Sequence, residues 1–104
     1  MARKVTWTDA ALNDLDGIAA YIARDSAYYA AAFVRNIRSV ACSLARFPRR
    51  GRIVPELERE AIRELIVGNY RLVYRLSEDS AIVVALIHGA RDFPTTFARD
   101  LFKE

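Results

Sequence analysis

The sequence changes its hydrophobic period once, near Pro48, and this change limits the order of elements that the chain can form. Before Pro48, apolar residues recur every three or four positions, which is the spacing of amphipathic helices. After Pro48, short runs of alternating residues are separated by turn residues, which is typical of β-strands. We therefore expect helices in the first half of the chain and strands in the second.

Two helices are expected before Pro48, each with its own start signal. A short β-compatible run, Arg3 to Trp7, precedes them. Thr8 is a preferred N-cap residue type, and Ser26 repeats this signal after a break at Asp25. The apolar stripes that follow contain Ala11, Leu15, Ile18 and Ile22 in the first helix, and Ala30, Phe33, Val34, Ile37, Val40, Ala41 and Leu44 in the second.

Three strands are expected after Pro48, over Ala61–Val67, Tyr70–Leu76 and Ala81–His88. Gly68-Asn69 suits a tight hairpin between the first two. The third run is apolar on both faces, as a central strand covered on both sides would be. The order predicts an α+β domain, β-α-α-β-β-β, with the two N-terminal helices packed on one face of an antiparallel sheet that the first run also joins.

Composition narrows the class of protein further. The 104 residues predict one domain, residues 1–104, with a possible short C-terminal helix over Pro94–Phe102. The single cysteine, Cys42, excludes an internal disulfide framework, and its apolar neighbours predict that it is buried. No spacing typical of a metal site or a cofactor loop is present, so no metal and no cofactor are expected. The longest apolar run is too short to span a bilayer, and the first residues lack the apolar core of a signal peptide, so we expect a cytoplasmic location without a membrane partner.

The basic residues are nearly all arginines. The chain has 16 basic and 13 acidic residues and a net charge of +3, and only Lys4 and Lys103 are lysines. Arginine can hold a carboxylate or a phosphate with two parallel hydrogen bonds, and four arginines fall in the loop Arg46–Arg52. Codon bias in a GC-rich genome produces the same composition. The charge therefore permits an anionic partner without requiring one, and direct contact with nucleic acid stays open.

Several motifs resemble the ParE/RelE superfamily of bacterial toxins. They are Val5-Thr-Trp-Thr-x-x-Ala-x-x-Asp-Leu15, Gly51-Arg-x-x-Pro-Glu56, Arg63-Glu-Leu-Ile-Val-Gly-Asn-Tyr-Arg-Leu-Val-Tyr-Arg75 and Ile87-His-Gly-Ala-Arg-Asp92, which together extend over nearly the whole chain. The resemblance implies the β-α-α-β-β-β layout already expected from the periods. It also implies the toxin half of a type II toxin–antitoxin pair, whose partner is a small antitoxin that often binds DNA.

The ending His-Gly-Ala-Arg-Asp is closer to ParE-like chains, which inhibit DNA gyrase by binding and are not nucleases. On this leading interpretation no residue is catalytic. The resemblance then implies a surface that binds gyrase or an acidic antitoxin segment, made of Arg63, Arg71, Arg75, His88 and Arg91. A local pair between Arg91 and Asp92 is an equally good account of Arg91.

The alternative is a RelE-like nuclease that cuts messenger RNA on the ribosome. Cleavage through the RNA 2′-hydroxyl needs a base, an acid and cations for the phosphate charge. The resemblance nominates Glu56 as the base, Arg71 as the phosphate-binding cation and His88, the single histidine, as the remaining titratable group. Each also has a structural interpretation, and His88 is not followed by the aromatic residue that some nucleases carry. A degenerate member that only assembles with its antitoxin is a third interpretation.

Three tyrosines, Tyr21, Tyr28 and Tyr29, crowd the junction of the two expected helices. Exposed tyrosines often mark interfaces, and packing of the helices against the sheet explains these residues almost as well. The sequence leaves both interpretations open.

Overall fold

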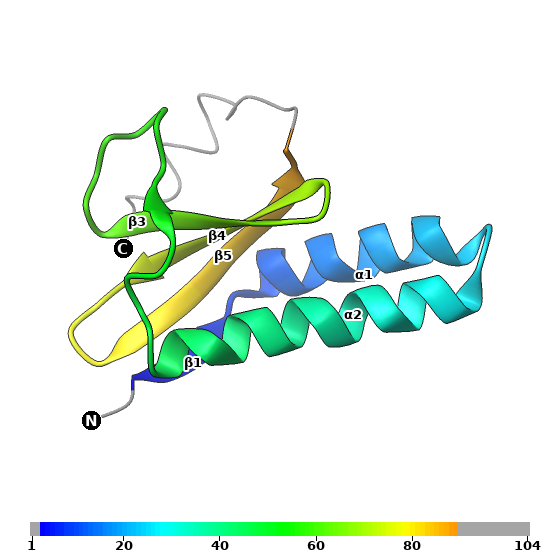
Figure 1. Cartoon of the computed structure of the whole chain (residues 1–104), viewed down its shortest axis with the longest axis horizontal. Helices are drawn as coiled ribbons and strands as arrows, with labels where there is room; N and C mark the ends of the chain where they lie inside the picture. Colours follow the sequence, from blue (N-terminus) through cyan, green and yellow to red (C-terminus); the bar gives the residue numbers. More distant parts are fainter. Residues whose placement is uncertain (1–2, 90–104) are drawn as a thin grey trace.

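The computed structural model of the protein describes residues 3–89 and contains the elements that the hydrophobic periods predict (Figure 1). In chain order these elements are β1 (Lys4–Trp7), α1 (Asp9–Ala23), α2 (Ala27–Cys42), the short 3-10 helix η1 (Ser43–Ala45), β2 (Arg52–Ile53), β3 (Ile62–Val67), β4 (Tyr70–Leu76) and β5 (Ser80–His88). The expected helix over Pro94–Phe102 and the candidate residue Arg91 lie outside the described residues.

The five strands form one sheet in the order β1-β5-β4-β3-β2. Strands β2 to β5 pair antiparallel with one another, and β1 lies parallel to β5, with Thr6 opposite Ile82. The predicted α+β fold is confirmed, and the first strand joins the sheet as expected. Its parallel pairing makes the sheet mixed. The sequence did not predict β2, because a strand of two residues is too short to show a period.

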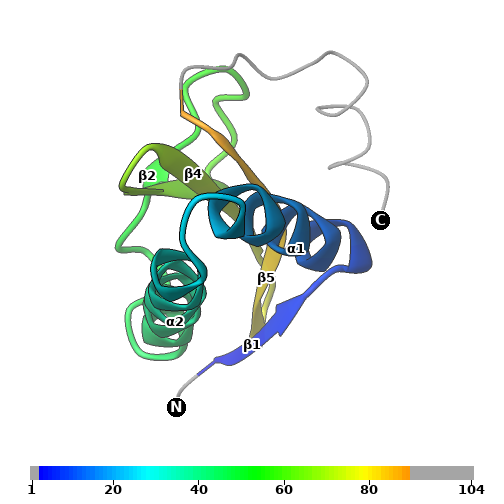
Figure 2. The same cartoon turned by 90° about the vertical axis from the view of Figure 1, so that its right-hand side faces the viewer.

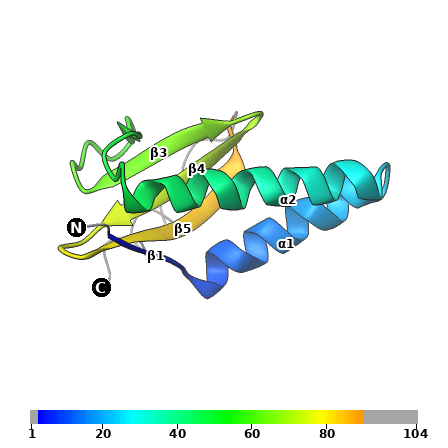
Figure 3. The same cartoon turned by 60° about the horizontal axis from the view of Figure 1, so that its bottom comes forward.

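Both helices lie on the same face of the sheet, as predicted, and each begins at the expected cap (Figures 2 and 3). The Thr8 side chain accepts a hydrogen bond from the Ala11 amide at 3.1 Å, and the Ser26 side chain accepts one from the Tyr29 amide at 3.1 Å. The prediction of a buried Cys42 is wrong, because this thiol is exposed. The preceding residue, Ala41, faces the core, and a helix turns by about 100° at each residue.

Apolar side chains are buried on both faces of the sheet. The face under α1 and α2, called the helix face below, carries the larger cluster, made of Ala11, Leu15, Ile37, Ala41, Leu44, Val67, Leu72, Tyr74, Ala81, Val83 and Leu86. The opposite face, called the loop face because the segment before β3 packs on it, carries Val54, Ile62, Val73, Val84 and Ala85, with Leu57 packed against them. Strand β5 contributes to both clusters, which confirms that it is a central strand covered on both sides.

A bulge in β5 changes which of its side chains face the helices. Val73 pairs with Ala85 and the next residue, Tyr74, pairs with Val83, so Val84 is the extra residue. Val84 and Ala85 consequently both belong to the loop-face cluster, although they are neighbours in sequence. The alternation of a regular strand is therefore interrupted in β5 at this point.

The Tyr74 hydroxyl fixes the arginine-rich loop that leads into β2. This buried hydroxyl accepts a hydrogen bond from the Gly51 amide at 3.0 Å and donates one to the Pro48 carbonyl at 2.7 Å. A Cβ at Gly51 would lie 2.6 Å from the Glu64 carbonyl oxygen and 2.7 Å from the Tyr74 hydroxyl, so only glycine fits there. Burial raises the pKa of the Tyr74 phenol, which keeps it a hydrogen-bond donor.

Tyr74→Phe should lower the free energy of unfolding by about 1–3 kcal/mol, because it leaves the Gly51 amide and the Pro48 carbonyl unpaired. Urea denaturation measures this change. The matched control is Tyr21→Phe, at a tyrosine that is 66% exposed, where we expect a change within about 0.5 kcal/mol. Equal effects of the two substitutions would contradict the role given to the Tyr74 hydroxyl.

Candidate functional site

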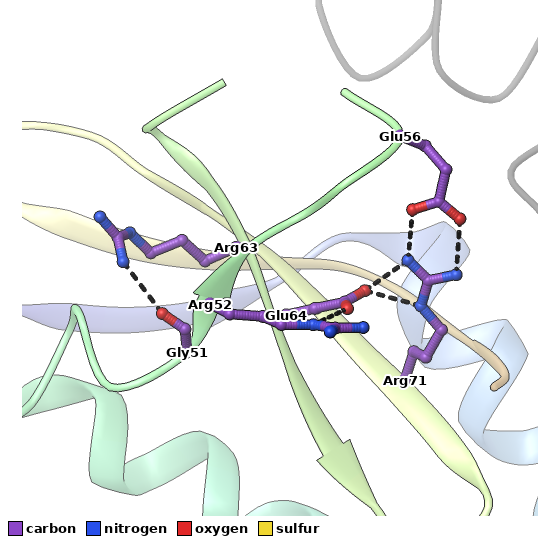
Figure 4. Close-up of polar contacts among 6 residues, drawn as sticks. All are labelled: Gly51, Arg52, Glu56, Arg63, Glu64 and Arg71. Atoms are coloured by element: carbon purple, nitrogen blue, oxygen red, sulfur yellow. Dashed lines mark hydrogen bonds and ion pairs between the residues drawn. The ribbon is translucent and has the colours of Figure 1, made fainter. Parts of the chain in front are cut away.

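Arg71 is a buried charged residue at the centre of the candidate site. It lies on β4 with 5% of its surface exposed, and its side chain points across the loop face toward Glu64 on β3 (Figure 4). The Arg71 Nε donates a hydrogen bond to Glu64 Oε1 at 2.6 Å. Since Glu64 is itself 1% exposed, each charge supplies the partner that the other needs in order to be buried.

Glu56 closes the other side of the Arg71 guanidinium. Arg71 Nη1 donates to Glu56 Oε2 at 2.9 Å and Nη2 donates to Glu56 Oε1 at 2.8 Å, which is a bidentate pair. Arg52 on β2 completes the chain of charges, because its Nε donates to Glu64 Oε2 at 2.6 Å. The four residues, here called the ion cluster, alternate in sign and carry no net charge.

The ion cluster shifts the pKa values of Arg71 and Glu56 in the direction that keeps both groups charged. The hydrogen bonds that Arg71 donates to Glu56, and then those that it donates to Glu64, raise the pKa of Arg71 above its ordinary value against the opposing effect of burial. The hydrogen bonds from Arg71 lower the pKa of Glu56, and this effect outweighs the effect of burial. A carboxylate with a lowered pKa holds a proton less readily and is a weaker general base.

His88 lies on the other face of the sheet. It pairs with Tyr70, and their ring centroids are 5.6 Å apart. The Tyr70 ring in turn contacts Phe33 of α2, with the centroids 5.2 Å apart. The rings of Tyr70 and His88 are therefore both on the helix face. The structure thus brings together Glu56 and Arg71 of the three nuclease candidates, and it places His88 across the sheet from them.

The predicted arginine surface is likewise divided between the two faces. Arg63 pairs with Tyr74 and donates to the Gly51 carbonyl from its Nη1 at 2.9 Å, on the helix-face side of β3 (Figure 4). Arg75 is two residues beyond Val73 on β4 and pairs with Ile62 on β3, so strand alternation places it on the loop face with Arg71.

The sequence analysis missed Glu64 and Arg52. A signal for Glu64 was present, since the two-residue turn at Gly68-Asn69 fixes the β3–β4 register and puts Ile66 opposite Arg71. Glu64 is two residues before Ile66 on the same face, so its carboxylate is diagonal to Arg71 across the strand pair. No comparable signal exists for Arg52, because its two-residue strand is too short to show a hydrophobic period in the sequence.

A groove between α1 and β5 is the second feature of the site. It is lined by Asn13, Asp14, Gly17, Ile18, Leu86, Ile87 and His88. Strand β1 ends opposite Val83, so beyond that point α1 takes its place, and the Asp14 carboxylate accepts a hydrogen bond from the Leu86 amide at 3.1 Å. Burial raises the pKa of Asp14, and the bond from Leu86 opposes that rise.

Within residues 3–89, no three side chains of the metal-ligating types come together at a metal-binding distance. Over the same residues, neither helix has both the length and the apolar surface needed to cross a membrane.

Solved structures define the class of fold. A chromosomal ParDE toxin–antitoxin system from P. aeruginosa matches with a TM-score of 0.69 and 20% identity, over 84% of this chain and 96% of the other. The toxin–antitoxin complex RelBE2 from Mycobacterium tuberculosis matches with a TM-score of 0.58 and 23% identity, over 85% and 99%. The fold is therefore that of the ParE and RelE toxins.

Sequence comparisons identify the family. The family model described as the ParE toxin of the type II toxin–antitoxin system parDE matches residues 5–93, and the chain belongs to this family. Toxin RelE2 of Caulobacter vibrioides is 33% identical over 88 residues, covering 85% of this chain and 97% of the relative. A putative toxin, Y4kP, of Sinorhizobium fredii is 36% identical over 100 residues, covering 90% and 97%. The resemblance read from the motifs is confirmed, and the protein is a type II toxin of the ParE/RelE superfamily.

Arg71→Met should lower the free energy of unfolding by about 3–5 kcal/mol, because it leaves the buried Glu64 carboxylate without its principal partner. Adding Glu64→Leu should recover at least half of the loss, since the double variant buries no unpaired charge at that position. Denaturant unfolding of both variants measures the difference. A cost below about 1 kcal/mol for Arg71→Met would show that the ion cluster does not support the fold.

The toxin should lose stability in acid through Glu56. The pKa of Glu56 is lower in the folded state than its ordinary 4.5, so its ion pair contributes fully above that value and is lost as the pH falls through the folded pKa. Thermal melts from pH 7 to pH 3 should fall less steeply for Glu56→Gln than for the wild type. Parallel curves for the two proteins would contradict the cause given for the shift.

Proposed function

We propose that this toxin acts by binding and inhibiting DNA gyrase, in the cytoplasm, and that a cognate antitoxin silences it. The observation that carries the proposal is the closed ion cluster: the guanidinium of Arg71 is held by Glu56 and Glu64 on one face of the sheet, while His88 lies on the other. The groups that RNA cleavage would use therefore do not converge on one reacting phosphate.

The chemistry of the ion cluster also favours binding over cleavage. A phosphate-binding arginine must offer N–H donors to the phosphate, whereas at least three of the five N–H groups of Arg71 already donate to carboxylates. A general base must be able to take a proton near neutral pH, whereas the pKa of Glu56 is lowered. Opening this cluster for substrate would uncover the buried charge of Glu64.

The remaining candidates fit a binding role better. We propose that Arg63, Arg75, His88 and Arg91 contact gyrase or the antitoxin directly, and that Arg71 acts by holding the loop before β3 in place. The groove between α1 and β5 suits an antitoxin segment, because His88 is exposed at its end. The solved structures of similar fold come from toxin–antitoxin systems, which supports an antitoxin partner.

A paired assay on purified toxin tests the proposal. Gyrase supercoiling with trapping of the cleavage complex runs beside cleavage of messenger RNA on programmed ribosomes. Loss of supercoiling with intact RNA is the expected result. Cut RNA with normal gyrase would establish the RelE-like alternative. The relative named RelE2 is the reason to test this alternative. Activity in neither assay would indicate a degenerate toxin.

His88→Ala separates the two mechanisms within that assay. Loss of a general acid or base costs a factor of about 10²–10⁴ in rate, so a nuclease that uses His88 should be disabled. A gyrase-binding toxin loses one exposed contact, and we expect its inhibitory concentration to rise by less than about tenfold. Thermal melting of the variant checks that it is folded. Complete loss of gyrase inhibition in a folded variant would count against a binding surface shared among several residues.

A further inference from the structure

The positive charge of the chain is concentrated in one segment. Between Asp25 and Glu56 the sequence has no acidic residue and six arginines, against a net charge of +3 for the whole chain. This segment comprises α2, η1, the loop and β2. The rest of the sequence has ten basic and 13 acidic residues, so this segment is the most basic part of the chain.

Three of these six arginines bind other side chains of the protein. Arg49 pairs with Glu60 at 3.0 Å and Arg52 pairs with Glu64 at 2.6 Å. Arg50 donates to the Ser43 hydroxyl at 2.6 Å. The other three are Arg35, Arg38 and Arg46, and all are exposed. Across residues 3–89 the structure gives these three no ion pair and no side-chain hydrogen bond.

Arg35 and Arg38 lie on the exposed surface of α2. Tyr28, Ala31, Arg35, Arg38 and Cys42 follow one another at spacings of three and four residues and are all exposed, so they form one stripe, called the outer stripe below. The buried residues of α2, which are Ala30, Ile37 and Ala41, lie on another side of the helix, about 120° around its axis from the centre of the outer stripe. In Figure 3 no other element passes over α2.

We propose that the outer stripe of α2 binds the phosphate backbone of duplex DNA without regard to base sequence. Arg35 and Arg38 lie about 4.5 Å apart along the axis of α2, at about 1.5 Å per residue. Arg46 follows η1, past the C-terminal end of α2, and adds a third positive charge beyond the stripe. Duplex DNA presents one charge for about every 1.7 Å of its length. Tyr28 on the stripe and Ser39, which follows Arg38 in sequence, are both exposed and carry hydroxyl donors of the kind that commonly accompany arginine on phosphates. The stripe therefore matches DNA in charge and in donor type.

The residues between the arginines favour DNA over a protein partner. The exposed positions of the outer stripe that are not arginine are small, apart from Tyr28, which is 70% exposed. Protein interfaces usually have an apolar centre of large side chains. The middle of the outer stripe has none, and the large exposed side chains Tyr29 and Phe47 lie toward its two ends, beside Tyr28 and Arg46. Small residues allow a phosphate backbone to come close to the helix.

The inference does not rest on gyrase inhibition, because it concerns the toxin and DNA alone. Fluorescence anisotropy with a labelled 20-base-pair duplex, titrated at several salt concentrations, measures the affinity. The test variant is Arg35→Gln/Arg38→Gln. The matched control is Lys4→Gln/Arg59→Gln, which removes the same charge from two exposed positions outside α2, one on β1 and one in the segment before β3. Thermal melting establishes that both variants are folded.

We expect the wild type to bind the duplex at 50 mM salt, with an affinity that falls as salt rises. The Arg35/Arg38 variant should bind at least about tenfold more weakly, with a salt slope smaller by about 2, and the control should stay close to the wild type. Absence of wild-type binding, or equal weakening by both variants, would overturn the inference. The same titration is run with labelled polyglutamate as a model of an acidic protein. If the test variant loses binding to polyglutamate and keeps binding to DNA, the inference is overturned and the outer stripe binds an acidic protein instead.

Discussion

The loop face of this toxin depends on one interaction, the burial of the Arg71 guanidinium between Glu64 and Glu56. A charge that leaves water must be paired and fully hydrogen-bonded, and Arg71 meets both conditions with three donor nitrogens on two carboxylates. The pairing joins β4 to β3 and to the loop before β3, and Arg52 extends it to β2. Four separate segments of the chain are thereby held by one alternating set of charges.

This arrangement decides how the site can be interpreted. From the sequence of a toxin of this superfamily alone, an arginine and a glutamate fit a nuclease site as well as a binding surface. In the structure they are bound to each other, and His88 is on the opposite face beside Tyr70. Under the proposed function, Arg71 maintains the shape of the sheet and of the loop that packs on it, and other basic residues contact the partners.

Much of the fold could be predicted from the sequence because its signals are local. The caps at Thr8 and Ser26 and the alternation in β4 depend on residues close together in the chain, and the structure has them as expected. The bulge at Val84 and the burial of Arg71 depend on contacts across the sheet. The error at Cys42 has a related cause, since apolar neighbours do not specify on which side of a helix one residue lies. The candidate site was for this reason predicted less completely than the fold.

The central claim is that Arg71 is a buried structural cation in the toxin in solution. The most direct test is the exchange of arginine Nε–H protons with water at neutral pH, measured by nuclear magnetic resonance on ¹⁵N-labelled protein. The account predicts that the Arg71 proton exchanges far more slowly than the proton of exposed Arg35, because its Nε donates to the buried Glu64 carboxylate. Equal exchange rates would contradict it, since they would show that the ion cluster opens freely and that Arg71 is available to an RNA phosphate.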